Sequence, residues 1–301
     1  MVIKTERLIK SFNSSRAVSA VNLNIEAGTV YGLLGRNGAG KTTLLRLILG
    51  ILKADQGSAK VFGEDFATSD KNLRQRVAYI GQDYRFYNSY TLAELVNILA
   101  PLYPKWNWDK ADHLLNLFEL KLDQRLGELS GGQRQKASML VAFSCGAELL
   151  ILDEPAAALD PISRRLAMGE MMNFIMDNPE KNTIIFSTHI VDDLERVANR
   201  VGMMDNGQLT HEFDLDDIHD SMRKVQIVFH QDIEANYQLE AALSCNQDKN
   251  VLTAIYDFSE ESSKVELDKL KKSGASIQDF PVNLEEFFVQ IYGSSSVMTV
   301  E

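Results

Sequence analysis

The sequence has few cysteines and no apolar run long enough to cross a membrane. Its two cysteines, Cys145 and Cys245, are too few for a disulfide framework, so we expect the reducing setting of the cytosol. The apolar segment 44–52 is interrupted by Arg46 and Gly50 and is shorter than the roughly 20 residues that span a bilayer. The first residues also lack the apolar core of a signal peptide. We therefore expect a soluble chain that needs another subunit for any role at a membrane.

Basic residues are outnumbered by acidic ones. The sequence has 31 Lys and Arg against 42 Asp and Glu, which gives a formal net charge of −11 at pH 7. This balance argues against a nucleic-acid partner, because phosphate backbones are bound by basic surfaces. It does not argue against a nucleotide, which a loop can bind largely through backbone dipoles. With 301 residues, the chain is long enough for one large domain or two smaller ones.

A glycine-rich loop dominates the first part of the sequence. Residues 35–42 match the phosphate-binding pattern G-x-x-x-x-G-K-[ST], between an apolar strand at 29–34 and a helix at 42–49. Glycines let the backbone approach a polyphosphate, and the helix N-terminus faces the anion. Lys41 supplies a charge to the β- and γ-phosphates, and the Thr42 hydroxyl can bind Mg²⁺. The predicted nucleotide-binding residues of this loop are Gly35, Asn37, Gly38, Ala39, Gly40, Lys41, Thr42 and Thr43.

Acidic and polar side chains stand at the ends of later apolar strands. The run 149–154 ends in Asp153 and Glu154, whose side chains point to opposite sides and can take different roles. Asp153 is predicted to hold Mg²⁺ through water, while Glu154 orients or deprotonates the attacking water. Gln82, after the strand at 77–82, has a neutral amide that can bind Mg²⁺ or position water. His189, at the tip of the strand at 183–189, is placed to touch a γ-phosphate. The alternative is a set of solvated strand ends.

A second turn of small residues precedes another helix. Ser130, Gly131, Gly132 and Gln133 lead into an amphipathic helix at 133–145, which makes a second anion site at a helix N-terminus. It is not a copy of the first site, because it lacks a lysine and a preceding strand. Asp160 lies in a turn before a helix at 162–176.

Phe12 lies between two predicted strands, at 2–4 and 20–25. Its ring is placed to stack on adenine, and the alternative is a half-buried strand residue.

The pattern of apolar and polar residues predicts a domain boundary near residue 215. Residues 83–145 read as an inserted helical subdomain, whose aromatic segment 83–90 is either a docking surface or a small satellite core. From residue 216 the pattern restarts, and a small α+β domain is predicted. Its predicted elements are strands at 225–229 and 251–256, a helix at 265–272 and a final helix at 284–291.

Taken together, residues 1–215 resemble the ATP-binding subunit of ABC transporters. The family motifs occur in family order: Phe12 as the adenine-stacking position, 35–42 as Walker A, Gln82 as the Q-loop, 129–133 as the signature, Asp153 and Glu154 as Walker B, Asp160 in the D-loop and His189 as the switch. The resemblance implies an α/β P-loop NTPase fold with a helical subdomain, and hydrolysis of ATP with Mg²⁺. It also implies a head-to-tail homodimer or heterodimer in which Ser130, Gly131 and Gly132 close on the partner's ATP.

The same resemblance implies a separate transmembrane permease, which would hold the chain at the inner face of the cell membrane. Two departures are modest: the family often has tyrosine at Phe12, and Ala156 and Ala157 stand where threonine and serine are frequent. The pattern from Leu284 to Gly293 resembles the ends of ATPases paired with ABC-2-type exporters. The Trp106 segment resembles the subgroup linked to cell-envelope antibiotic responses, so we expect export. The alternative is that residues 216–301 merely stabilise the domain or the dimer.

Two other classes of protein share part of this pattern. A non-transport ABC ATPase, acting as a soluble remodelling or translation factor, would carry the same motifs. Translation-type members usually have two cassettes, and the acidic charge speaks against a nucleic-acid target. A G-protein-like switch or a metabolic kinase shares the phosphate-binding loop but does not need the signature at Ser130.

Overall fold

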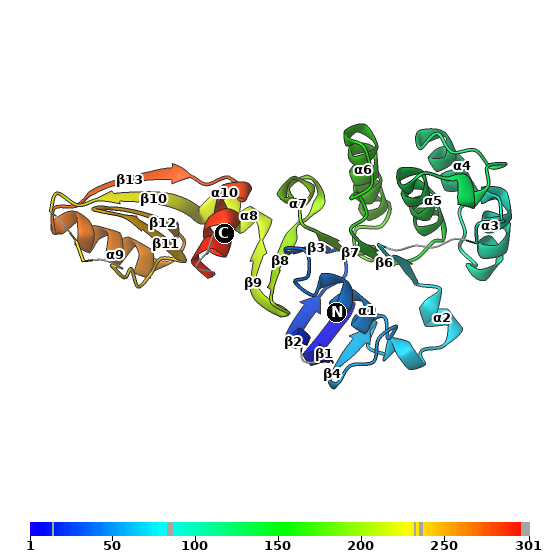
Figure 1. The fold of residues 1–301 in the computed structure, drawn as a ribbon, viewed down its shortest axis with the longest axis horizontal. Coiled ribbons are helices and arrows are strands. Elements are labelled where there is room, and N and C mark those ends of the chain that lie inside the picture. Colours follow the sequence, from blue (N-terminus) through cyan, green and yellow to red (C-terminus); the bar gives the residue numbers. More distant parts are fainter. Residues whose placement is uncertain (14, 83–86, 232, 235–236, 296–301) are drawn as a thin grey trace. The chain divides into compact units, whose positions relative to one another are not determined.

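The computed structural model describes residues 1–13, 15–82, 87–231, 233–234 and 237–295 (Figure 1). The chain divides into two compact units, Met1–Glu212 and Phe213–Glu301. Part of the predicted aromatic segment, residues 83–86, lies outside the described residues.

A six-stranded sheet forms the centre of the first unit. Its strand order is β5-β6-β7-β3-β8-β9. The strand bounds are β3 Val30–Leu34, β5 Val77–Ile80, β6 Leu149–Asp153, β7 Thr183–Thr188, β8 Arg200–Asp205 and β9 Gln208–Asp214. Neighbours from β5 to β8 run parallel, and β3, β6 and β7 are buried along their whole length. Parallel strands end at the same edge of a sheet, so the residues that follow β3, β6 and β7 come together there.

A second, antiparallel sheet lies across helix α1 (Lys41–Ile48) from the first. It contains β1 (Ile3–Phe12), β2 (Ser15–Ile25) and β4 (Gln56–Val61) in the order β2-β1-β4. The apolar core between the sheets includes Ile3, Leu23, Leu33, Leu44, Leu45, Ile151 and Ile185. β1 and β2 are much longer than the predicted strands at 2–4 and 20–25. Register shifts along their pairing break the apolar alternation, which explains why the sequence pattern shows only parts of them.

Helices surround the parallel sheet, and several gather at one end of the first unit (Figure 1). These are α3 (Leu92–Leu99), α4 (Trp108–Leu117) and α5 (Gly131–Ser144), and α4 packs on α5. The remaining helices of the unit are α2 (Lys71–Arg74), α6 (Pro161–Asp177) and α7 (Val191–Val197), with short 3₁₀ turns at 66–68, 100–102 and 126–128. No helix in the described part of the chain is long and apolar enough to cross a membrane.

The second unit is a four-stranded antiparallel sheet with helices. Its strands are β10 (Met222–Val228), β11 (Ser244–Asp248), β12 (Val251–Asp257) and β13 (Ser276–Pro281), in the order β11-β12-β10-β13. Its helices are α8 (Leu215–Ser221), α9 (Glu261–Lys272) and α10 (Leu284–Ser295). Leu267 and Leu270 of α9 join the core of the sheet. The edge strands β11 and β13 are absent from the sequence prediction. β11 consists almost entirely of polar residues, and β13 is almost entirely exposed, so neither shows a clear apolar alternation.

Candidate active site

The glycine-rich loop joins β3 to α1 in a backbone conformation that leaves no room for a Cβ atom at two of its glycines. Gly40 has a φ of +104°, and a Cβ there would lie 2.2 Å from the carbonyl oxygen of Ala17. Gly35 is confined in the same way, because its Cβ would lie 2.5 Å from the carbonyl oxygen of Met204. Gly40 also precedes the first turn of α1 without capping it through a side chain. The N–H groups of that turn are therefore available to an anion.

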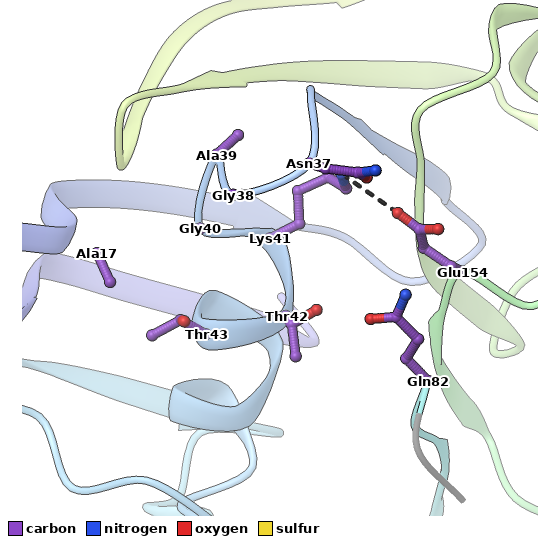
Figure 2. A pocket seen from close by; sticks show the side chains of 10 residues that line it. All are labelled: Ala17, Asn37, Gly38, Ala39, Gly40, Lys41, Thr42, Thr43, Gln82 and Glu154. Atoms are coloured by element: carbon purple, nitrogen blue, oxygen red, sulfur yellow. Dashed lines mark ion pairs between the residues drawn. The ribbon is translucent and has the colours of Figure 1, made fainter. Parts of the chain in front are cut away.

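A cavity of about 260 Å³ opens beside this loop (Figure 2). Its lining residues are Ala17, Asn37, Gly38, Ala39, Gly40, Lys41, Thr42, Thr43, Gln82 and Glu154. Figure 2 shows Gln82 and Glu154 facing Lys41 and Thr42 across the cavity. The structure therefore places the loop, the strand-end glutamine and one strand-end carboxylate around a single space.

Lys41 and Glu154 form a buried ion pair across the cavity. Lys41 Nζ lies 3.4 Å from Glu154 Oε1, and the two side chains are 5% and 8% exposed. The ammonium also donates to the carbonyl oxygens of Gly35 at 2.7 Å and Arg36 at 3.2 Å. These acceptors aim the charge of Lys41 at the space that a polyphosphate would fill. An incoming phosphate would replace the Glu154 carboxylate as its partner.

Asp153 supplies a buried carboxylate directly behind this space. Its Oδ1 accepts hydrogen bonds from Thr42 Oγ1 at 3.0 Å and from Ser187 Oγ at 2.7 Å. Its Oδ2 is buried and has no hydrogen-bond partner among the described residues. A hydroxyl, a carboxylate oxygen and the nearby Gln82 amide are the hard oxygen ligands that Mg²⁺ takes together with phosphates and water. The residues present therefore fit a magnesium ion.

No group of three or more His, Cys, Asp or Glu side chains able to hold a metal occurs in the described part of the chain.

Glu154 has an unusual backbone and two further polar contacts. Its φ is +49°, a left-handed conformation that is uncommon for a residue with a Cβ and that clusters at functional sites. Its N–H donates to Ser187 Oγ at 2.9 Å. Its Oε2 lies 3.2 Å from Nδ1 of His189, whose side chain is 40% exposed. Glu154 thus touches both Lys41 and His189, one through each carboxylate oxygen.

Ser187 and Ala17 are site residues that the sequence analysis missed. Ser187 lies one residue before the end of β7, in register with Asp153 on β6. The two apolar strands ending in Asp153 and His189 give no signal for Ser187 by themselves, because their pairing is visible only in the structure. No sequence signal identifies Ala17, a small residue in the β1–β2 hairpin that the sequence pattern did not outline.

Phe12 lies at the end of β1 and is 45% exposed. Lys10 Nζ lies 5.6 Å from its ring centroid. Phe12 is not among the residues that line the described cavity. Its contact with adenine stays a prediction, for which its exposed ring leaves room.

The second predicted anion site lies apart from this cavity. Ser130 caps α5: its Oγ accepts from the N–H of Gln133, and the Gln133 side chain accepts from the N–H of Ser130. A Cβ on Gly132 would lie 3.0 Å from the carbonyl oxygen of Ala158, so this turn touches the turn before α6. The described residues that line the cavity do not include Ser130, Gly131, Gly132 or Gln133.

Asp160 caps α6 and likewise does not line the described cavity. It accepts from the N–H groups of Ile162 and Ser163, both at 3.0 Å. Hydrogen bonds from the hydroxyl and N–H of Ser163 lower the pKa of the Asp160 carboxyl. Asp160 therefore has a structural role within the chain, and its contact with a nucleotide stays a prediction.

Comparison with known proteins decides the family. The family model described as ABC transporter matches residues 18–157. The ABC transporter ATP-binding protein YtrB of Bacillus subtilis is 32% identical over 292 residues, which cover 97% of this chain and 98% of YtrB. The chain belongs to the ATP-binding proteins of ABC transporters.

Two further likenesses extend this assignment. The bacitracin transport ATP-binding protein BcrA of Enterococcus faecalis is 30% identical to this ABC ATPase over 310 residues, covering 98% of each chain. A solved ATP-binding subunit of an ABC transporter superposes with a TM-score of 0.64 at 26% identity, covering 73% of this chain and 92% of that one.

These findings confirm the predicted family and the predicted P-loop NTPase fold. The chain is an ATP-binding, ATP-hydrolysing subunit of a transporter, and the soluble-factor alternative has no support among these relatives.

Alanine at Gly38 or Gly40 tests the loop geometry. Gly38 has a φ of +83°, but a Cβ there meets nothing within 4 Å. Gly38→Ala should therefore lower the free energy of unfolding by the left-handed cost of about 1–2 kcal/mol. Gly40→Ala should lose a further 1–3 kcal/mol or so, because its Cβ also overlaps Ala17. Urea unfolding without nucleotide measures both, and equal losses would contradict the close approach at Gly40.

Proposed function

We propose that this ABC ATPase drives export through a separate transmembrane permease, which holds it at the inner, cytoplasmic face of the cell membrane. The observation that carries the proposal is the similarity to the bacitracin transport protein over 98% of each chain. That similarity extends beyond the ATPase motifs into the C-terminal segment, where the sequence resembles subunits of exporters. In this proposal residues 1–215 are the ATPase domain, and residues 216–301 are an accessory α+β domain.

The chemistry proposed for the site follows from its contacts. Lys41 exchanges the Glu154 carboxylate for the β- and γ-phosphates of ATP, while the loop N–H groups bind the remaining phosphate oxygens. Thr42, Asp153 and Gln82 would hold Mg²⁺, which neutralises phosphate charge when bound. Glu154, released from Lys41, orients or deprotonates the attacking water. His189 is close enough to Glu154 to reach the same γ-phosphate.

Two copies are needed to complete the site in this proposal. The Ser130 turn and Asp160 do not line the cavity formed by their own glycine-rich loop. We infer that they serve the ATP of a second subunit in a head-to-tail dimer. That second subunit is either another copy of this chain or a related ATPase.

A mixing experiment tests the shared site. Ser130→Arg places a bulky cation in the turn that would close on the partner's ATP. It should abolish hydrolysis and leave ATP binding to its own loop unchanged, because the cavity residues are intact. Lys41→Ala should lose ATP binding, because the ammonium is the cation aimed into the cavity. Mixing the two inactive variants should restore hydrolysis, because one intact loop then faces one intact Ser130 turn.

Asn107→Arg is the matched control for Ser130→Arg. Asn107 caps α4 through its side chain, just as Ser130 caps α5, and both residues are exposed. Losing either cap costs on the order of 1 kcal/mol of stability. Asn107→Arg should keep its ATPase activity. Failure of the mixture to hydrolyse ATP, or lost ATP binding by Ser130→Arg, would contradict the shared site.

Purification from membranes tests the transport assignment. The tagged chain is isolated from detergent-solubilised membranes of its source cells, and bound proteins are identified by mass spectrometry. We expect a stoichiometric partner with several membrane-spanning segments and no ATP-binding cassette of its own. A second cassette protein in the same complex would make the ATPase pair heteromeric. Recovery of ribosomal or DNA-associated proteins alone would contradict the proposal.

A further inference from the structure

Ser187 lies at the point where the two acidic residues of the site meet. It pairs in register with Asp153 across the parallel strands β6 and β7, and it is fully buried. Side chains in register on neighbouring strands share one face of the sheet. The Ser187 hydroxyl therefore faces the Asp153 carboxylate inside the protein and away from solvent.

The hydroxyl of Ser187 makes one contact with each acidic residue. It donates to Asp153 Oδ1 at 2.7 Å and accepts from the N–H of Glu154 at 2.9 Å. A hydroxyl has a single O–H to donate, so its donor is committed to Asp153. One buried atom thereby connects the carboxylate of Asp153 to the backbone of Glu154.

The bond to Asp153 helps to fix the orientation of its carboxylate. Oδ1 already accepts from Thr42 and Ser187, whereas Oδ2 has no hydrogen-bond partner within the described part of the chain. A carboxylate held by two donors on one oxygen cannot rotate without breaking both bonds. The carboxylate is thus held in one orientation, in which it would bind magnesium or a water ligand of magnesium.

The bond from Glu154 stabilises an unfavourable backbone. Glu154 has a φ of +49°, and strained residues of this kind persist only when their surroundings hold them. The Glu154 N–H would be buried without a partner if Ser187 lost its hydroxyl. Ser187 therefore maintains the direction from which the Glu154 side chain reaches Lys41 and His189.

We propose that Ser187 is a positioning residue for ATP hydrolysis, which fixes the orientation of the Asp153 carboxylate and the left-handed backbone of Glu154 through one hydroxyl. The proposal rests on the roles proposed above for Asp153 and Glu154. Ser187 does not line the cavity, so it acts through Asp153 and Glu154.

Three substitutions at Ser187 separate its hydrogen bonds from its volume. Ser187→Ala removes both bonds, and Ser187→Cys fills nearly the same space with a thiol that hydrogen-bonds weakly. Both should lower kcat by about 10-fold or more, the usual effect of removing an outer-shell partner of a metal ligand. Ser187→Thr keeps the hydroxyl and should restore kcat.

Thr183→Val is the matched control on the same strand. Thr183 is also fully buried, and its Oγ1 likewise donates one hydrogen bond, to Lys181, and accepts one, from Gly28. It lies at the opposite end of β7 from the site. Thr183→Val should lower the melting temperature at least as much as Ser187→Ala while leaving kcat unchanged.

A binding measurement supplies a readout other than turnover. The dissociation constant of a fluorescent ATP analogue is measured for the full chain in EDTA and in Mg²⁺. Ser187→Ala should match the wild type in EDTA, because Lys41 and the loop are unchanged. The gain in affinity on adding Mg²⁺ should fall by about 10-fold. A merely structural role would leave that gain unchanged.

Two results would overturn the proposal: Ser187→Ala with normal kcat and a normal magnesium effect, or Thr183→Val with an equal loss of kcat. The variants Asp153→Asn and Glu154→Gln distinguish its failure from that of the proposed function. If they lose turnover while Ser187→Ala does not, only the role of Ser187 is wrong. If all three keep turnover, the roles of the two acidic residues are wrong as well.

Discussion

The buried ion pair between Lys41 and Glu154 connects two segments that are far apart in the sequence. Lys41 begins α1 after the glycine-rich loop, and Glu154 follows β6, so their contact requires both the parallel sheet and the loop to be in place. A buried charge that loses its partner is strongly destabilising, which means that each residue stabilises the other here. In the proposed chemistry, ATP competes with Glu154 for the Lys41 ammonium. In that proposal, one interaction stabilises the site and also controls when Glu154 becomes free to act on water.

Three consecutive residues at the end of β7, residues 187–189, connect this ion pair with other parts of the site. Ser187 faces the two acidic residues, and His189 reaches Glu154. Between them, Thr188 Oγ1 donates to Asp193 at 3.0 Å, and Asp193 is held by two bonds from Arg164 of α6. Because α6 is also the helix that Asp160 caps, the strand end connects Glu154 with the residue proposed to serve the ATP of the second subunit.

The sequence predicted most of the residues that line the cavity, because they belong to local patterns. A glycine loop between a strand and a helix, and polar residues after apolar strands, can be recognised without knowing which strands are neighbours. Ser187 escaped because its role depends on its register with Asp153, which is a property of the sheet rather than of one segment. β11 and β13 escaped for a different reason: they are edge strands with few apolar residues, so the sequence shows no clear apolar alternation there. The contacts of Phe12, Ser130 and Asp160 with nucleotide depend on molecules outside this chain and stay predictions.

Glu154→Gln tests the central claim most directly, through ATP affinity and turnover measured on the same preparation. Glutamine keeps the shape of the side chain but removes the charge that competes for Lys41 and the base that acts on water. We expect ATP to bind at least as tightly as to the wild type, while turnover falls by about 100-fold or more. Turnover close to that of the wild type, or weakened ATP binding, would contradict the exchange of Glu154 for phosphate at Lys41 and the catalytic role of Glu154.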